Sequence, residues 1–368
     1  MTFLNHGSFG ATPKPVFEVY QAWQRKVELE PVQFFMWEMY VHLAEARGVL
    51  GEFVGVSAEN LAFVENATTG VNIVARSLPL QAGDEIIGTN HIYGACDKTL
   101  AYICRKTGAK QLIVDIPLPC SSDEITERIW SAVTPQTKLI FLSHITSPTA
   151  LRLPVEEICR RAREAGIWTL IDGAHVPGQL DLDLTAMDCD FYSANCHKWL
   201  NSPKHAGFLY VRPDLQSLIE PLVISWGFDG DRSGTGSQFL ERLQLQGTRS
   251  QAAYLSVPRA IEFLQEHDWD TVRVRCHDLV NQWLAGMAKI TGLPSLYADE
   301  AQYGQFATAL LPDVGDLPAF QKRLFDDHRV EMPCIEWNGN KMMRVSVQGY
   351  NDSADIEKSL TALAQMLA

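Results

Sequence analysis

The chain has 368 residues, of which 46% are hydrophobic and 20% charged, the balance of an ordinary globular protein with room for a large and a small domain. A formal net charge of −13 without runs of like charge argues against nucleic acid and against an anionic membrane as partners. The eight cysteines form no Cys-x-x-Cys pair and no cluster at metal-ligand spacing, so we expect no metal site and reduced thiols in a cytoplasmic protein.

The first residues, 1–14, contain glycines and prolines that indicate an extended arm and a turn. They lack a basic stretch followed by an apolar core, and no later stretch reaches about 18 apolar residues, so we expect neither a secretory signal nor a membrane span. Helical apolar spacing follows at Val16–Trp23 and at Tyr40–Phe53. Between these helices, the aromatic patch Phe34-Phe35-Met36-Trp37 indicates core or dimer packing, with a wall of the substrate pocket as the alternative.

Strand patterns and helix patterns then alternate, which predicts a parallel sheet. Leu61–Glu65 is typical of a strand, and the helix after it holds Thr68 and Thr69 in its first turn. Free backbone N–H groups at such a position suit an anion, although the pattern alone is only that of a helix N-cap. Further strands are predicted at Asp84–Thr89, Lys138–Ser143 and Ile167–Ile171, with a helix at Pro154–Ala165 that ends at Gly166 and makes a right-handed crossover.

Two neighbouring strand ends carry the side chains that decide the chemistry. One apolar run, Ile167–Ile171, ends in Asp172, and a second, Phe191–Ala194, leads to Lys198. Because ligands of open α/β sheets bind beyond the carboxyl ends of the strands, we expect both side chains to face one crevice. A lysine amine condenses with a carbonyl to form an imine, and a carboxylate beside a pyridine nitrogen keeps that nitrogen protonated. The pair therefore predicts pyridoxal 5′-phosphate (PLP) as cofactor, whereas a lone lysine is usually a surface residue and a lone aspartate often only forms a turn.

The second half of the chain predicts the end of the large domain and a small α+β domain. Gly207–Val211 is a further strand, and the glycine-rich segment 226–237 indicates a lid or a dimer-contact loop. We predict an arm at 1–14, a large domain at 15–265 and a small domain at 266–368. Their remaining elements are helices at Ala252–Gln265, Val272–Ala288, Leu317–Asp326 and Ser353–Leu367, and strands at Gln305–Leu311 and Met342–Val347.

Several of these segments are similar to one known family. The run from Asp172 to His175, the pair His197-Lys198 and Arg344 resemble the class V aminotransferase family of fold-type I PLP enzymes, over nearly the whole chain. The segments Leu4–Gly10, Gly247–Arg249 and Arg344–Gln348 are similar to its isopenicillin N epimerase-like branch, which is related to cysteine desulfurases and selenocysteine lyases. The resemblance implies an α/β fold whose large domain has a mainly parallel seven-stranded sheet flanked by helices. It also implies a homodimer with active sites completed across the interface.

The resemblance further implies which residues hold the phosphate of PLP. Ala67, Thr68 and Thr69 at the helix start match the family's phosphate-binding turn. Asn195 and His197 are expected to donate to the same phosphate.

Other family positions surround the cofactor ring. Tyr93, with His91 as the weaker candidate, matches the residue that stacks on the outer face of the ring. His175 matches a position near the imine and the phenolic oxygen, and Ser147 stands where desulfurase relatives carry an asparagine bonded to that oxygen.

The remaining family positions concern the substrate and the second subunit. Arg344 matches the arginine that takes the substrate carboxylate through two parallel hydrogen bonds. Asn5 and His6 of the arm are expected near the substrate, with simple loop positions as the alternative. Thr248 matches a threonine that reaches the phosphate of the neighbouring subunit's cofactor, or else caps the following helix.

The cofactor does not by itself fix the reaction. We expect labilisation of the Cα proton of an amino acid or an amino-acid derivative, in an epimerase or a C–S (β-elimination) lyase, with Lys198 as general base. Aminotransfer is the alternative, and a cysteine desulfurase is disfavoured because Cys334 follows a proline and is interpreted as a packing residue. A non-enzymic scaffold is the least favoured hypothesis, since Lys198, Asp172 and Arg344 are all present.

Overall fold

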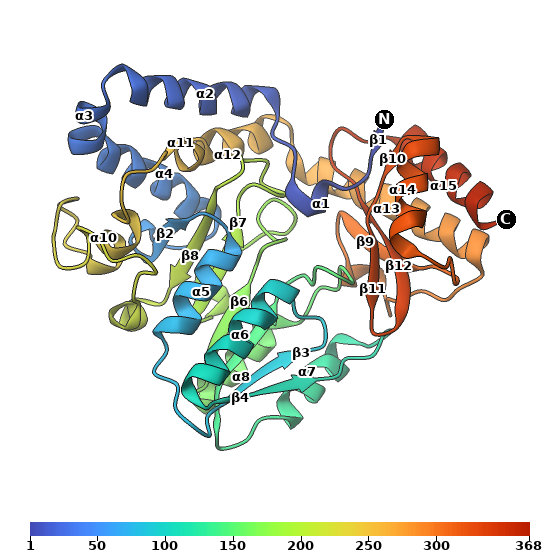
Figure 1. Ribbon diagram of the computed structural model, residues 1–368, viewed down its shortest axis with the longest axis horizontal. Coiled ribbons are helices and arrows are strands. Elements are labelled where there is room, and N and C mark those ends of the chain that lie inside the picture. Colours follow the sequence, from blue (N-terminus) through green and yellow to red (C-terminus); the bar gives the residue numbers. More distant parts are fainter.

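A computed structural model describes residues 1–368 and has two lobes (Figure 1). The larger lobe is built on one sheet with the strand order β2-β8-β7-β6-β5-β3-β4. Strands β7, β6, β5, β3 and β4 run parallel, whereas β8 is antiparallel to both of its neighbours. The seven strands are β2 (Leu61–Val64), β3 (Glu85–Thr89), β4 (Lys110–Val114), β5 (Thr137–Ser143), β6 (Trp168–Asp172), β7 (Phe191–Asn195) and β8 (Gly207–Val211).

Helices cover both faces of this sheet, so its strands are apolar on both sides. Alternate residues of β5 illustrate the arrangement: Phe141 belongs to one buried cluster and Ile140 and Leu142 to the other. The first face packs against α5 (Ala67–Ser77), α6 (Gly94–Thr107) and α10 (Gln238–Gln244). The second packs against α4 (Met39–Phe53), α7 (Ser122–Ser131), α8 (Val155–Ala165), α9 (Leu184–Met187) and α12 (Val257–Glu266). Strands buried in this way read as continuous apolar runs, which is why all but the edge strand β4 could be predicted.

The smaller lobe has its own antiparallel sheet, ordered β11-β12-β9, with helices packed around it (Figure 1). The N-terminal arm joins this lobe, because β1 (Thr2–Phe3) pairs with β10 (Val330–Glu331) in parallel. The short helix α1 (His6–Phe9) then lies between the lobes (Figure 1). The other elements of the lobe are α13 (Trp269–Thr291), β9 (Phe306–Leu310), α14 (Leu317–His328), β11 (Cys334–Trp337), β12 (Asn340–Ser346) and α15 (Ser353–Leu367).

Several expected elements differ in extent from those in the structure. The helix expected at Ala252–Gln265 is interrupted at Ser256, dividing it into α11 (Ala252–Leu255) and α12, because Pro258 lacks the N–H that a continuous helix needs. The helix expected at Val16–Trp23 is longer and forms α2 (Lys14–Leu29), which leads through α3 (Pro31–Gln33) into the aromatic patch. Gly166 ends α8 as expected, with a φ of 68°.

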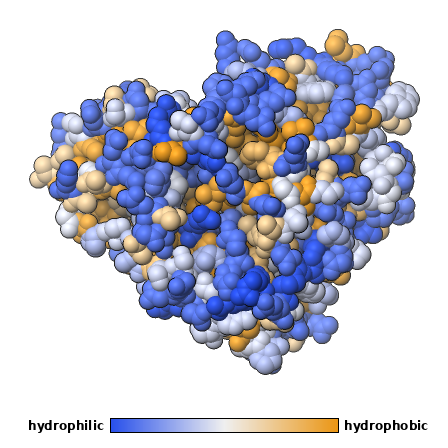
Figure 2. Space-filling model, turned by 180° about the vertical axis from the view of Figure 1, so that it is seen from behind, coloured by the Kyte–Doolittle hydropathy of each residue, from blue (hydrophilic) through white to orange (hydrophobic).

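The aromatic patch lies in a short π-helix, Phe34–Glu38, and only part of it packs into the core. Phe34 is buried, whereas Met36 and Trp37 are 54% and 66% exposed. Seen from behind, the two lobes are covered mainly by hydrophilic residues with hydrophobic ones scattered among them (Figure 2). No helix combines the length and apolarity that a bilayer-spanning segment needs. The domain boundaries at residues 14 and 265 stay predictions, although α13, just after the second boundary, packs on β9 and β12 of the small sheet.

Candidate active site

A cavity of about 490 Å³ opens at the carboxyl ends of the central strands of the large sheet. Register explains this placement, because Ser143 pairs with Asp172 and Asp172 pairs with Ser193 at the ends of β5, β6 and β7. The cavity is lined by Ser8, Phe9, Asn66, Ala67, Thr68, Thr69, Tyr93, Ser143, Ile145, Ser147, Asp172, Ala174, His175, Asn195, His197 and Lys198. The structure therefore brings together most of the predicted site residues from five separate segments.

Lys198 lies at the inner end of the cavity, where its Nζ is 3.1 Å from Nε2 of His175. It forms no ion pair with a carboxylate at contact distance. Burial, followed by the charge of Arg344, lowers the pKa of the Lys198 amine from 10.5 to about 8. Burial, followed by the charge of Lys198, also lowers the pKa of His175 well below its usual value. The imidazole is therefore neutral at neutral pH, and the amine loses its proton far more readily than an ordinary lysine.

Asp172 is buried at the end of β6 and has no cationic partner at contact distance. Its Oδ1 accepts a hydrogen bond of 3.0 Å from the Ala174 N–H, and the Cys96 thiol lies 3.6 Å from Oδ2. Burial raises the pKa of this carboxyl, and the Ala174 N–H and the Lys198 charge oppose that rise. A buried carboxylate without a counter-ion is costly unless a cationic group binds beside it.

The N-terminus of α5 lines another part of the cavity. Asn66 caps this helix by accepting the Thr69 N–H at 2.9 Å, and Asn195 accepts the Ala67 N–H at 2.8 Å. The helix dipole and its first N–H groups attract an anion here, even though the protein as a whole is negatively charged. His197 also lines the cavity, and its Nδ1 is hydrogen-bonded to the Ala206 carbonyl, so its Nε2 remains free to bind a ligand.

Arg344 comes from β12 of the small lobe and is buried beside the cavity. Its guanidinium donates to the Ser147 carbonyl at 2.7 Å and to Ser8 Oγ at 3.1 Å. Its Nε is buried without a partner, and it forms no ion pair with a carboxylate. Burial lowers the pKa of Arg344 to about 10, so the side chain stays cationic at neutral pH.

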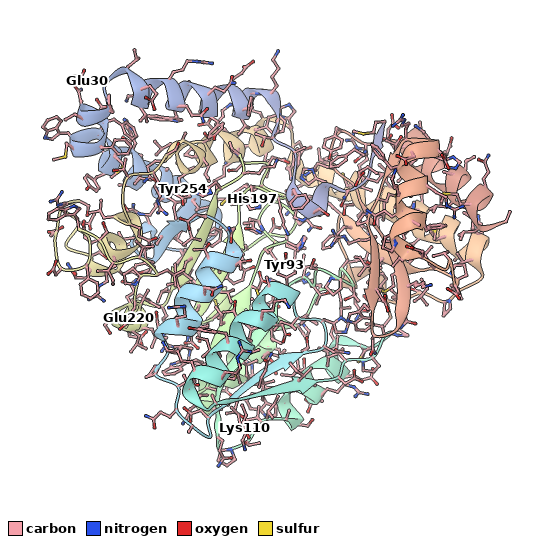
Figure 3. The ribbon with its side chains drawn as sticks, in the orientation of Figure 1. Glu30, Tyr93, Lys110, His197, Glu220 and Tyr254 are labelled. Carbon is pink, nitrogen blue, oxygen red and sulfur yellow. The ribbon has the colours of Figure 1, made fainter.

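The predicted ring-stacking residue lies at the cavity, and the weaker candidate does not. Tyr93 lines the cavity and is 44% exposed; Figure 3 labels it with His197 near the junction of the lobes. His91 is instead buried between the Thr149 hydroxyl and the Ile116 carbonyl, against the ring of Trp337. Ser147 also lines the cavity, but its hydroxyl is 3.4 Å from Arg344.

The arm reaches the site differently from what the sequence led us to expect. Asn5 and His6 do not line the cavity, whereas Ser8 and Phe9 do. Asn5 bonds Glu331 and Ser8, and the fully buried His6 bonds the Lys198 carbonyl and the Tyr350 hydroxyl. The side chains of Asn5 and His6 thus support the site from behind. The spacing of a helical turn from Asn5 to Ser8 is the one sequence feature that could have pointed to Ser8.

Thr248 lies outside this cavity, in a separate surface depression of about 540 Å³. Residues of the aromatic patch and of the glycine-rich segment, including Met36 and Trp226, line the same depression. Cys334, on β11, does not line the Lys198 cavity either, and burial raises its pKa to about 12. Its thiol is therefore protonated at neutral pH, in agreement with a packing role.

Comparison with known proteins decides the family. The model of aminotransferase class-V proteins matches residues 11–358. The chain belongs to the class V aminotransferase family. Within this family, isopenicillin N epimerase of Streptomyces clavuligerus is 33% identical over 372 residues, covering 98% of this chain and 93% of that protein. A protein of Oryza sativa subsp. japonica, assigned by name to the L-cysteine desulfhydrases, is 27% identical over 409 residues, covering 99% of this chain and 83% of that protein.

Solved structures of class V aminotransferase relatives share the fold. The cystine C–S lyase C-DES with its product cysteine persulfide has a TM-score of 0.83 at 22% identity, covering 99% of this chain and 97% of that chain. The cysteine desulfurase CsdA of Escherichia coli has a TM-score of 0.84 at 19% identity, covering 100% of this chain and 94% of that chain. These likenesses confirm the predicted α/β fold.

The cavity fits the cofactor of this family. A free lysine amine, a buried carboxylate that lacks a cation and a helix N-terminus open onto one space, matching the aldehyde, pyridine nitrogen and phosphate of PLP. The protein is a PLP-dependent enzyme of the class V aminotransferase family.

Proposed function

We propose that the enzyme removes the Cα proton of an amino acid or an amino-acid derivative and then either epimerises it or eliminates a β-sulfur group. The observation that carries this proposal is one amine base that lines the cavity and one arginine without a carboxylate partner that bonds two residues of the cavity wall. Lys198, with a pKa of about 8, can take up a proton near neutral pH, and Arg344 is a buried cation without a carboxylate partner.

Each residue has a separate task in this proposal. Lys198 would hold PLP through its amine, and its free amine would take up the Cα proton on Nζ. Asp172 holds a proton on the ring nitrogen, and PLP supplies an electron sink when it is bound. Arg344 fixes the substrate carboxylate with its two-donor fork.

The phosphate and ring contacts are also part of the proposal. The α5 N-terminus at Ala67, Thr68 and Thr69, with Asn195 and His197, would hold the phosphate. Tyr93 would cover the outer face of the ring, while His175 and Ser147 would lie on the side of its phenolic oxygen. Asn5 and His6 would not contact the substrate and would act only by positioning the cavity residues Ser8 and Lys198.

Different relatives support the two outcomes. Epimerisation is supported by the isopenicillin N epimerases, which are 33% identical. Elimination of a β-sulfur group is supported by the desulfhydrases at 25–27% identity. Desulfurase chemistry is less favoured because Cys334, half-buried on β11, does not line the Lys198 cavity.

A substrate screen separates these outcomes. The PLP-loaded enzyme is incubated in deuterium oxide with L- and D-amino acids and with S-substituted cysteines. Exchange of the Cα hydrogen with change of configuration and no release identifies an epimerase, whereas release of pyruvate and a thiol or sulfide identifies a lyase. An enzyme that catalyses neither exchange nor release with any substrate, while binding PLP, contradicts the proposal.

We also propose a homodimer in which Thr248 reaches the partner's cofactor phosphate. Trp226 is 71% exposed and Trp37 66% exposed beside the Thr248 depression, and apolar surface of this kind is typical of an interface. Sedimentation of the wild-type protein should give a dimer, and Trp226→Glu should weaken it. Val274→Glu, at a residue of the small lobe that is 63% exposed, serves as control. A monomeric wild type contradicts the proposal.

The cytoplasmic location expected from composition also remains a proposal. All eight cysteines are free, as they are in a reducing compartment. Cell fractionation tests it directly, and recovery in a secreted fraction would contradict it.

A further inference from the structure

Trp199, the residue after Lys198, makes a hydrogen bond that the proposed function does not yet use. Its side chain is fully buried, and its Nε1 donates to Nδ1 of His175 at 3.1 Å. The ring of Phe306, from the small lobe, lies 4.7 Å from the His175 ring at an interplanar angle of 23° and 5.3 Å from the Trp199 ring. The His175 ring is thus fixed by Phe306 on its face and by the Trp199 indole at Nδ1.

The indole contact determines where the His175 proton lies. An indole N–H can only donate, so Nδ1 of His175 must accept and cannot carry hydrogen. A neutral imidazole then carries its proton on Nε2, the nitrogen 3.1 Å from Lys198 Nζ. The flipped ring would present Cδ2 to the indole and Cε1 to the amine, losing both hydrogen bonds.

We infer that Trp199 is a positioning residue whose indole N–H holds neutral His175 as the Nε2–H tautomer, so that His175 only donates into the cavity. The Lys198 amine can accept that hydrogen only when it is unprotonated, because an ammonium has no lone pair. This inference rests on the proposed function only for the role of Lys198 as base.

The proton balance of the proposed step follows. When Lys198 takes the Cα proton, an N–H bond forms on Nζ, the Cα–H bond breaks and its electron pair stays with the substrate. The ammonium then faces the Nε2–H donor, so their hydrogen bond is lost and the proton is easily passed on. His175 accepts no proton on Nε2, and Lys198 is the base of the pair.

The other titratable groups near Lys198 act alongside this bond. Arg344 opposes a second positive charge on Lys198, whereas Asp172 and Cys96 favour one. The charges of Lys198, Arg344 and His197 all disfavour protonation of His175. Lys198 contacts Nε2 and Trp199 contacts Nδ1, but only the indole is restricted to donating, so it fixes which nitrogen accepts.

Nitrogen-15 NMR of histidine-labelled full-length protein tests the tautomer directly, and His175→Gln assigns the resonance. We expect the Nε2–H pattern for His175 at pH 7, with and without PLP. A Nδ1–H tautomer or an imidazolium in the wild type would overturn the inference. If PLP fails to bind while the Nε2–H pattern is present, the inference stands and the proposed function fails.

Trp199→Phe removes the indole donor, and the chain offers a matched control. Trp283 is equally buried, lies in the small lobe, and has an Nε1 without a partner, so Trp283→Phe removes similar volume but no hydrogen bond. The pKa of Lys198 is read in cofactor-free protein by competitive acetylation and mass spectrometry across pH. We expect Trp199→Phe to mix the tautomers and to raise the Lys198 pKa by about one unit, since a hydrogen bond accepted from the ammonium then becomes available. Unchanged values, or an equal shift in Trp283→Phe, would overturn the role of the indole, and the wild-type spectrum remains decisive if Trp199→Phe does not fold.

Discussion

The active site has two cationic side chains, Lys198 after the large sheet, which lines the cavity, and Arg344 in the small sheet, which bonds two residues of the cavity wall. Arg344 is buried and Lys198 is half-buried, and neither pairs with a carboxylate at contact distance. Burial brings the pKa of Lys198 to about 8 but that of Arg344 only to about 10. Loss of hydration thus brings the lysine close enough to neutral pH to act as a base. The arginine stays protonated and can bind an anion, because a guanidinium starts from a higher pKa.

Removing the amine should have the largest effect. Lys198→Ala should lower turnover by at least about 10³-fold, since both the tether and the base are lost. Lys110→Ala, at an exposed lysine on β4, should leave turnover unchanged in the same assay. Comparable turnover in Lys198→Ala and wild type would contradict the assignment of Lys198, rather than Arg344, as the catalytic base.

Removing the guanidinium should act on substrate capture rather than on PLP. Arg344→Leu should lower kcat/KM by about 100-fold, as expected when two charged hydrogen bonds to a carboxylate are lost, and should leave PLP absorbance intact. Arg344→Lys keeps the charge without the fork and should recover only part of that loss. An unchanged KM in Arg344→Leu would place the carboxylate elsewhere.

The pH dependence separates the two cations within the wild-type enzyme. Below a pKa of about 8 Lys198 is protonated and cannot accept the Cα proton, so kcat should fall about tenfold per pH unit as the pH drops below this value. Arg344 stays charged over the same range, so substrate affinity should change little. A kcat that is flat from pH 6 to pH 9 would show that this amine is not the base.

The smallest effect on kinetics is expected for Ser8, which supports the Arg344 guanidinium. Ser8 Oγ accepts from Arg344 at 3.1 Å and donates to Asn5 Oδ1 at 2.5 Å. Ser8→Ala should raise KM by about three- to tenfold through loss of one hydrogen bond, with kcat nearly unchanged. Ser122→Ala, at the exposed start of α7, is the control, and a larger change in kcat than in KM would contradict a role confined to Arg344.

Residues next to buried strands were predictable from the sequence. Asp172 and Lys198 follow apolar runs, and strand ends that pair in register meet at one edge of the sheet. The start of α5 was predictable for a similar reason, because Asn66 and Thr69 form a local cap. Arg344 was predicted inside a strand of the small domain, although its place beside the cavity was implied only by family resemblance.

Contacts between distant segments were not predictable. Ser8 meets Arg344 across 336 residues of sequence, and the indole of Trp199 meets a histidine 24 residues earlier only through the packing of Phe306 from the small lobe. Strand β4 was missed because Lys110–Val114, at the edge of the sheet, has no fully buried residue and lacks the apolar run of a central strand. The expectation for Asn5 and His6 placed them near the substrate, whereas tertiary packing turns both side chains away from the cavity.

The central claim is that the Lys198 amine carries PLP beside Asp172. The most direct measurement is reduction of the PLP-loaded protein with sodium borohydride, followed by digestion and mass spectrometry of the labelled peptides. The account predicts one pyridoxyl-modified residue, Lys198, and loss of that label in Lys198→Ala. Modification of a different lysine, or a label that persists in Lys198→Ala, would contradict it.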